Sequence, residues 1–515
     1  MHPMKKFLSI FTLALLALAG RAALPQSDLI AQIHFAGGDK VSADKNYPAF
    51  ANEFSSAEAL ALRKQIADKL APWLAKNLNA AVPEGAAKLR PLLDDLQSAE
   101  WFFEARTAAD GLPDMALAIK LAAARAQLWQ TEMKAFFPAA TFKQSGGWLV
   151  FNSNVAAQKL GDGLMQKFSI PQTNWASADV NWPRLARWLP AVKALQLPET
   201  ALQVSADATN LLVAGKCFFV ENLSLKADAW RFPTNTIHQP FTSFTAVRGM
   251  AGWLKTQAWA QPFVVTPVQN QAFFWAMNGM PFQTYSAVPV VNATQALGEL
   301  SPKLQTLVAE RNAHDGFMSP LTLLVTNNEL TLIGGPMIAP YVRSVKEASG
   351  EFLLFGGFPN PPRGKLAPPE LFARLAEPGL LYYHWEITSE RFSNQHQFDQ
   401  LALLLTRHKQ LDGEGIPYKW VATFAPHLGS TATEILQTAP DQLTFKRRAP
   451  GGFTAIELLA LANWFDAPNF PGGNLRLPPT SERMKQLRAR QQQQTPAAPR
   501  ILSFPAPPQA PAPAH

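Results

Sequence analysis

The chain has 515 residues, of which 47% are hydrophobic and only 16% are charged, and its formal net charge is +8. This composition excludes a mainly disordered protein, and the length predicts two or more domains. The positive charge lies at the ends: residues 1–22 carry three bases and no acid, and the chain from Arg476 onward carries six bases and one acid. Residues 23–475 are therefore neutral, which argues against nucleic acid as a partner, because phosphate binding depends on Lys and Arg.

The N-terminus has the pattern of a secretory signal peptide over residues 1–22. Two lysines precede an apolar run of 13 residues, from Phe7 to Ala19, and small residues follow it. The run is too short to cross about 30 Å of hydrocarbon as a helix. Arg21 stands where a lipoprotein would have its lipidated cysteine. We therefore predict export across the inner membrane to the periplasm or cell envelope, no lipid anchor, and no transmembrane helix in the mature chain.

The chain contains one cysteine, Cys217, between apolar neighbours. A single cysteine excludes an intramolecular disulfide and any metal site built from several cysteines. Its neighbours predict a small buried side chain rather than a reactive thiol. The histidines have no spacing typical of metal ligands, so no metal and no cofactor is predicted.

The N-terminal part after the signal, residues 23–111, is expected to be mainly helical. Residues 29–39 predict a short strand that leads into a turn. Residues 56–80 and 84–106 carry apolar residues at helical spacing.

From residue 112 onward, strands followed by amphipathic helices recur. The strand–helix junctions are MALAIKL with AAARAQLWQTEMKAFF, ASADVN with WPRLARWLPAVKAL, TYSAVPVV with NATQALGELSPKLQTL, and LLYYHWEI with TSERFSNQHQFDQLALLL. Further strands follow most of these helices, which predicts four degenerate β-α-β-β units in two halves, residues 112–229 and 230–476.

These units predict an α+β fold: antiparallel sheets with helices on one face, preceded by the helical N-terminal portion. Antiparallel pairing is favoured by LTLLVTNNELTLIG, two alternating strands around a short polar turn. A parallel sheet with helical crossovers is the alternative. The last segment, residues 477–515, contains nine prolines and a run of glutamines, and it predicts a disordered tail.

The strongest cluster of polar residues is HWEITSERFSNQHQFD. His384 and Glu386 are two residues apart on a predicted strand, so they share one face and could act as an acid–base pair. His396 and Asp399 lie on the following helix, and the sequence does not show that they converge with the strand pair. A solvent-facing strand edge beside a polar helix face is the favoured interpretation.

The region richest in aromatic residues is WRFPTNTIHQPFTSFTAVRGMAGWLKTQAWAQPF. Trp230, Trp253 and Trp259 are candidates to line a groove for a sugar or a peptide, because polar residues alternate with aromatic ones. Packing between the two halves is the favoured interpretation, since a chain with this many aromatic residues must bury most of them.

The stretch RRAPGGFTAIELLALANWF looks like a type IV prepilin processing site. A prepilin needs about twenty apolar residues after its glycine, whereas Asn463, Asp466 and Pro468 interrupt this run. A capping box is the better interpretation, with the Thr454 hydroxyl and the Glu457 carboxylate each accepting a backbone N–H of the other residue. We therefore predict that a helix begins here as the last core element.

The run WRFPTNTIHQPF, the export signal and the segment GFTAIELLALANWF resemble a family of exported bacterial proteins of unknown function. The resemblance implies location and no activity. No G-x-S-x-G or H-E-x-x-H motif is present. We therefore predict a non-enzymatic envelope protein with a binding or structural role, in which a cell-wall component is a candidate partner. Two alternatives are a hydrolase with its site in the cleft between the halves, and a pilin-like or secretion-system component. The sequence does not determine an oligomeric state.

Overall fold

The structure is a computed structural model that describes residues 28–471, apart from short gaps. These gaps cover residues 109–112, 168–169, 171, 190–196, 278–282, 315–319, 336–337, 358–363, 368 and 395–414. The predicted signal peptide, the predicted tail, His396 and Asp399 lie outside the described residues.

The described strands form a single 18-stranded sheet in which every pairing is antiparallel. The strands are β1 (Leu29–Phe35), β2 (Trp101–Arg106), β3 (Asp114–Lys120), β4 (Thr141–Ser145), β5 (Trp148–Asn152), β6 (Ala176–Val180), β7 (Glu199–Ala206), β8 (Leu211–Phe218), β9 (Phe241–Arg248), β10 (Gln271–Met277), β11 (Thr284–Val290), β12 (Thr322–Val325), β13 (Glu329–Ile333), β14 (Tyr341–Glu347), β15 (Gly350–Gly356), β16 (Leu380–Ile387), β17 (Ser430–Ala439) and β18 (Gln442–Ala449).

The helices lie between these strands in the chain. They are α2 (Gly38–Ser42), α3 (Pro48–Phe54), α4 (Ala57–Asn79), α5 (Gly85–Ser98), α6 (Ala123–Phe136), α7 (Gln158–Lys167), α8 (Trp182–Trp188), α9 (Ala251–Thr256), η2 (Ala258–Phe263), α10 (Ala293–His314), α11 (Pro369–Phe372), η3 (Ala373–Ala376), α13 (Ile416–Phe424), η4 (Ala425–His427) and α14 (Ala455–Asp466).

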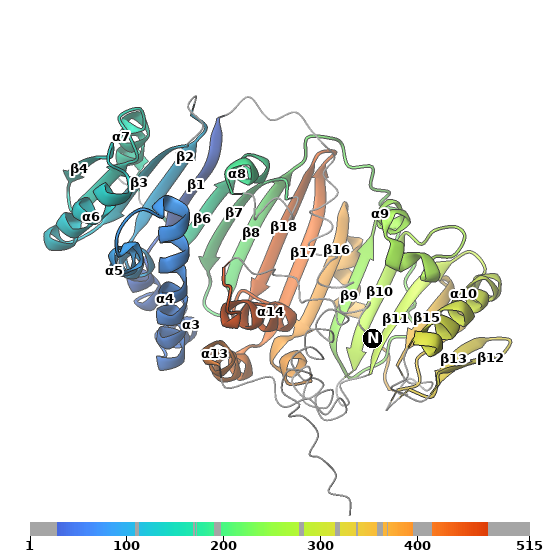
Figure 1. Ribbon diagram of the computed structural model, residues 1–515. Coiled ribbons are helices and arrows are strands. Elements are labelled where there is room, and N and C mark those ends of the chain that lie inside the picture. The colour runs from blue at the N-terminus through green and yellow to red at the C-terminus, as the bar shows by residue number, and fades with distance from the viewer. Residues whose placement is uncertain are drawn as a thin grey trace, which may run out of the picture.

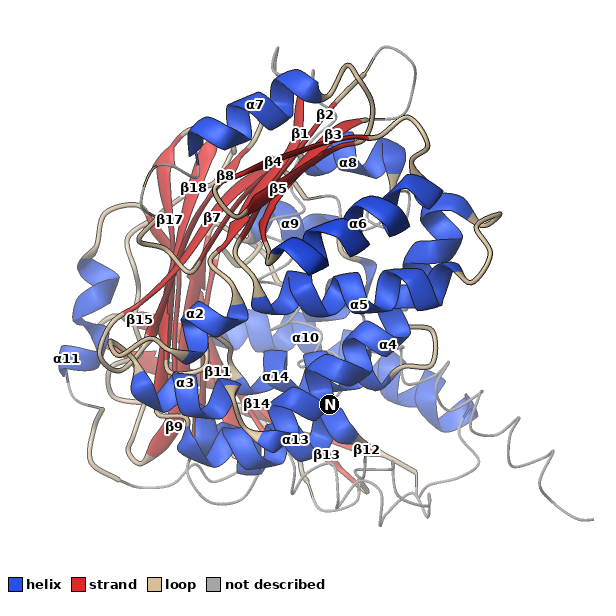
Figure 2. Cartoon of the chain, turned by 90° about the vertical axis from the view of Figure 1, so that its left-hand side faces the viewer, coloured by secondary structure: helices blue, strands red, loops and turns tan. Residues whose placement is uncertain are grey.

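The two faces of the sheet are covered unequally. One face, here called the helix-rich face, carries α4, α5, α6, α8, α9, α10, α13 and α14, whereas the opposite face, here called the open face, carries α7 and α11 (Figure 2). The expectation of helices on one face is therefore wrong in detail, since α7 packs on β2, β3 and β5 from the other side. The chain is an α+β protein built on one large antiparallel sheet.

Pairing of β8 with β18 joins the first half of the sheet, β1–β8, to the second half, β9–β18 (Figure 1). From this junction outward, the strand order of the first half is β8, β7, β6, β1, β2, β3, β5 and β4. The second half has the corresponding order β18, β17, β16, β9, β10, β11, β15 and β14. The second half adds β12 and β13 at its outer edge.

Several local predictions are confirmed, and one is wrong. Residues 29–35 form β1, and the hairpin around Asn327 and Asn328 forms β12 and β13. The helix expected over 84–106 ends at Ser98, and Trp101–Arg106 forms β2 instead. Aromatic residues in WFFEAR favour a strand, and the pairing of β2 with β1 and β3 overrides its apparent helical spacing. The expected boundary at residue 112 thus separates two paired strands, so the N-terminal portion belongs to the same sheet.

Helix α14 begins with the predicted capping box. The Thr454 hydroxyl accepts a hydrogen bond from the N–H of Glu457, and the Glu457 carboxylate accepts one from the N–H of Thr454 at 2.9 Å. The same carboxylate also binds the guanidinium of Arg447 on β18, at 2.7 and 2.8 Å. The cap therefore attaches the helix to the sheet as well as starting it.

Cys217 is buried on β8, as its neighbours predict. Burial raises the pKa of the Cys217 thiol to about 11, opposed by its contact with the Thr200 hydroxyl. The thiol is therefore protonated at neutral pH, which makes it a poor nucleophile.

Candidate ligand-binding pocket

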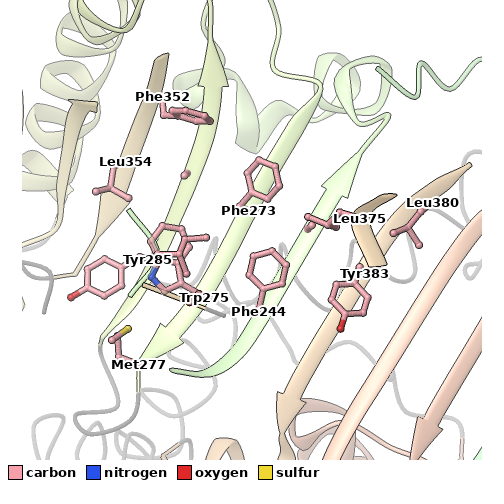
Figure 3. Packing of buried hydrophobic residues seen from close by; sticks show 14 of the residues in the cluster. Phe244, Phe273, Trp275, Met277, Tyr285, Phe352, Leu354, Leu375, Leu380 and Tyr383 are labelled. Carbon is pink, nitrogen blue, oxygen red and sulfur yellow. The ribbon is translucent and has the colours of Figure 1, made fainter. Parts of the chain in front are cut away.

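An aromatic core lies on the open face of the second half. Side chains from neighbouring strands meet there, including Phe244 on β9, Phe273 on β10, Tyr285 on β11 and Tyr383 on β16 (Figure 3). Phe244, Phe273 and Tyr285 are at most 1% exposed. Alternation along each strand places these residues on one face, where they form a buried aromatic cluster.

The segment 226–232 packs against this core and is held by polar side chains at the start of β10. The Gln271 amide donates to the carbonyl of Ala229 at 2.6 Å and accepts the N–H of Arg231 at 2.9 Å. Asn270 donates to the carbonyl of Lys226 at 2.8 Å. These bonds fix the backbone that carries Trp230 and Phe232 onto the sheet.

Helix α11 and η3 supply the opposite wall. Phe372 contacts Phe232 with ring centroids 4.2 Å apart, and Phe244 at 5.1 Å. Between this wall and the segment 226–232 is a pocket of about 660 Å³. The lining residues are Ala227, Ala229, Trp230, Phe232, Arg248, Phe372, Leu375, Ala376, Glu377, Pro378 and Gly379.

The turn at Gly379 closes the pocket next to β16. Gly379 has a φ of +73°, and a Cβ there would lie 2.6 Å from the carbonyl oxygen of Gln437. Glycine meets both requirements, because it adopts positive φ without strain and has no Cβ.

Arg248, the last residue of β9, is the basic side chain of the pocket lining and is only 6% exposed. Its Nε donates to the carbonyl of Leu380 at 2.6 Å, and its Nη1 donates to the carbonyl of Asp228 at 2.8 Å. The indole ring of Trp230 lies over the guanidinium, 4.6 Å from its centre. Burial lowers the pKa of Arg248 and the charge of Asp228 opposes that shift, but an arginine stays protonated at neutral pH.

The other polar groups of the pocket differ in whether they have a hydrogen-bond or ion-pair partner. The indole Nε1 of Trp230 is buried and has no hydrogen-bond partner among the described residues. Glu377 lies 3.6 Å from Arg374, which also binds Glu434. The acid of the lining is therefore paired, whereas the indole N–H is not.

The described lining of the pocket is mostly apolar. None of the described residues that form it is a His, Ser, Thr, Cys or Lys, and its two ionisable side chains are Arg248 and Glu377. The Glu377 carboxylate is the group of this lining that could act as a base. Aromatic walls with few polar groups are typical of sites that hold an apolar ligand.

The predicted catalytic pair lies on the helix-rich face, away from this pocket. His384 is 4% exposed and Glu386 is 1% exposed. The His384 ring bonds the Thr245 hydroxyl through Nδ1 at 2.8 Å and the Glu386 carboxylate through Nε2 at 3.2 Å. Glu386 also accepts the N–H of Ala455, the first residue of α14, at 2.8 Å. The pair is thus enclosed in a polar network that anchors a helix, so the expected solvent-facing strand edge is wrong.

The three predicted tryptophans are divided between two places. Trp230 lines the pocket. Trp253 and Trp259 pack against each other, with ring centroids 5.9 Å apart, in the core beneath α9 and η2. The structure therefore separates one ligand-binding candidate from two packing residues.

Sequence reasoning missed Arg248, Phe372 and Glu377. Arg248 carries a weak signal, since it is a charged residue at the end of the otherwise uncharged strand FTSFTAVR. Phe372 lies more than 120 residues further along the chain, in a short helix with no unusual composition. Its convergence with Trp230 depends on the pairing of β9 with β16.

No family model, curated protein or solved structure matches this chain. The resemblance to exported bacterial proteins therefore stays a prediction. Over the part of the chain that the structure describes, no helix is long and apolar enough to span a membrane, and no group of three or more potential metal ligands is found.

Proposed function

We propose that the protein is an exported, non-enzymatic binding protein of the bacterial envelope, and that the pocket at Trp230 holds its ligand. The observation that carries the proposal is a pocket with aromatic walls and a buried arginine, whose described lining contains no His, Ser, Thr, Cys or Lys. The signal-like N-terminus and the neutral body support the envelope location.

The two alternatives have less support. A hydrolase that uses His384 and Glu386 would need both groups to reach a substrate, but they are almost fully buried and bonded to Thr245 and Ala455. A pilin-like component would need a long apolar helix after Gly452. Helix α14 instead ends at Asp466, and Leu458 in its first turns is buried in the core between α13 and α14.

We propose further that the chain arose from duplicated α+β units. The matching strand order of the two halves supports duplication of the halves. The four smaller β-α-β-β units remain part of this proposal.

Export is testable with the full chain produced in a bacterial host. We expect the protein in the periplasmic or envelope fraction, with a mature N-terminus that begins between residues 19 and 24. Edman sequencing or mass spectrometry of the purified protein measures that N-terminus. A protein that keeps Met1 and stays in the cytoplasm would contradict the envelope location.

Filling the pocket should prevent ligand binding. Ala376 is exposed and lines the pocket, so Ala376→Trp should insert an indole without disturbing the core. We expect the full-length protein to bind the neutral apolar dye N-phenyl-1-naphthylamine, with a rise in dye fluorescence, and the variant to lose at least about tenfold in affinity.

The matched control is Ala373→Trp. Ala373 is also exposed and lies on the same short helix, but it does not line the pocket. This control should bind the dye as the unmodified protein does. If Ala376→Trp also bound the dye normally, the pocket would not be the binding site.

A further inference from the structure

We propose that the pocket takes a monocarboxylate with an apolar body, and that Arg248 and the indole N–H of Trp230 receive its carboxylate. This inference rests on the proposed binding function and adds the chemical class of the ligand. It depends on one buried cation that forms no ion pair with a described residue, one N–H without an acceptor among the described residues, and the position of one acid.

The charge is the guanidinium of Arg248, which forms no ion pair with a described residue, although the charge of Asp228 acts on it from a greater distance. No carboxylate of a described residue lies within 4 Å of it, although the side chain is 6% exposed. The guanidinium contacts two backbone carbonyls and a tryptophan ring, and Nη2 donates to none of the described residues. Buried cations are normally paired with anions, and the guanidinium fork matches a carboxylate. An anion that enters with the ligand would complete this site.

The unpaired N–H belongs to Trp230. A buried donor without an acceptor destabilises the protein, since it has lost its hydrogen bonds to water. The Trp230 ring lies directly over the guanidinium, so both groups border the same end of the pocket. A carboxylate placed there could accept hydrogen bonds from both.

The rest of the pocket defines the body and the charge of the ligand. Phe232, Phe372 and Leu375 form apolar walls, and about 660 Å³ is in the range of small-molecule sites. Glu377 is part of the lining and would repel a second negative charge. The ligand is therefore a monocarboxylate rather than a dicarboxylate.

Calorimetric titration of the full-length protein with three probes tests this inference. The probes are 3-phenylpropionate, its neutral amide 3-phenylpropanamide, and the dicarboxylate phenylsuccinate. We expect 3-phenylpropionate to bind at least about tenfold more tightly than either of the others. A fourth probe, N-acetylphenylalanine, distinguishes a free acid from a peptide C-terminus as the natural source of the carboxylate.

Two variants assign the preference to the proposed groups. Trp230→Phe keeps an aromatic ring but removes the N–H. It should lower the affinity for 3-phenylpropionate about fivefold or more and leave the affinity for the amide unchanged. Trp259→Phe, in the core on the other face, is the control for this variant. It should change neither the affinity for 3-phenylpropionate nor the affinity for the amide. Arg248→Lys should reduce the preference for the acid over the amide, because a lysine cannot form the two-pronged bond.

The outcomes separate this inference from the proposed function. Equal binding of acid and amide, or equal effects of Trp230→Phe and Trp259→Phe, would overturn the carboxylate assignment. Dye binding that is blocked by Ala376→Trp would then still support a ligand pocket. If Arg248→Lys does not fold, Trp230→Phe and the probe series decide the question.

Discussion

Replacing Glu386 by alanine is expected to lower the free energy of unfolding by about 3–5 kcal/mol. The Glu386 carboxylate is almost fully buried and binds both His384 and the first N–H of α14. Without it, the positive charge of Arg391 loses a nearby negative charge and the helix N-terminus loses an acceptor. Urea unfolding followed by circular dichroism measures the change.

The matched control is Glu434→Ala. Glu434 lies on the neighbouring strand β17 and binds Arg374 on the open face, where the pair meets solvent. Loss of this ion pair should lower the free energy of unfolding by about 1 kcal/mol or less. A Glu386→Ala variant that kept full stability but lost a hydrolytic activity would favour the hydrolase over a binding protein.

The effect of Glu386 should also depend on pH. Burial alone would raise the pKa of its carboxyl, but the hydrogen bond and charge of His384, with Arg391, hold the pKa below its usual range. Its stabilising contribution is therefore complete above the unfolded pKa of about 4.3 and is lost as the pH falls through the lower folded value. The difference between the unmodified protein and Glu386→Ala should shrink when unfolding is measured below about pH 4.

Replacing Phe273 by alanine is expected to lower the free energy of unfolding by about 3–5 kcal/mol. This ring is fully buried in the aromatic core (Figure 3) and contacts Trp230 and Phe232, with centroids 5.7 and 5.2 Å away. The cavity should also loosen the segment that carries Trp230, so affinity for 3-phenylpropionate should fall in parallel. Denaturant unfolding and calorimetry measure the two effects.

Phe218→Ala is the control for this substitution. Phe218 ends β8 and is 38% exposed, so its removal should cost less than about 1 kcal/mol and leave binding unchanged. Equal destabilisation by the two substitutions would mean that Phe273 is not the support that its burial indicates.

Features set by neighbours in the chain could be predicted from the sequence. The capping box at Thr454 and the hairpin of β12 and β13 need contacts between residues only a few positions apart. Strand β2 could not be predicted, because its conformation depends on β1, whose partner residues lie about seventy positions earlier. The single sheet could not be predicted either, since it depends on the pairing of β8 with β18 across more than 200 residues.

The candidate site could be predicted only in part, for the same reason. Trp230 was one of three tryptophans with equal standing, and the structure distinguishes them by the face of the sheet to which each belongs. His384 and Glu386 do share a face, as their spacing predicts. The sequence could not show that α14 covers that face, since the covering N–H comes from Ala455, 69 residues after Glu386.

The pairing of β8 with β18 also determines the stage of folding at which the sheet can be completed. Strand β8 is finished at residue 218, but its partner begins at residue 442, close to the end of the described chain. Until those residues are available, β8 is an open edge with unpaired backbone groups, and such edges promote aggregation. A chain that is threaded unfolded across a membrane from its N-terminus would expose this edge for most of its passage. We therefore expect the two halves to join into one sheet late in folding, through β17 and β18, the last hairpin of the described residues.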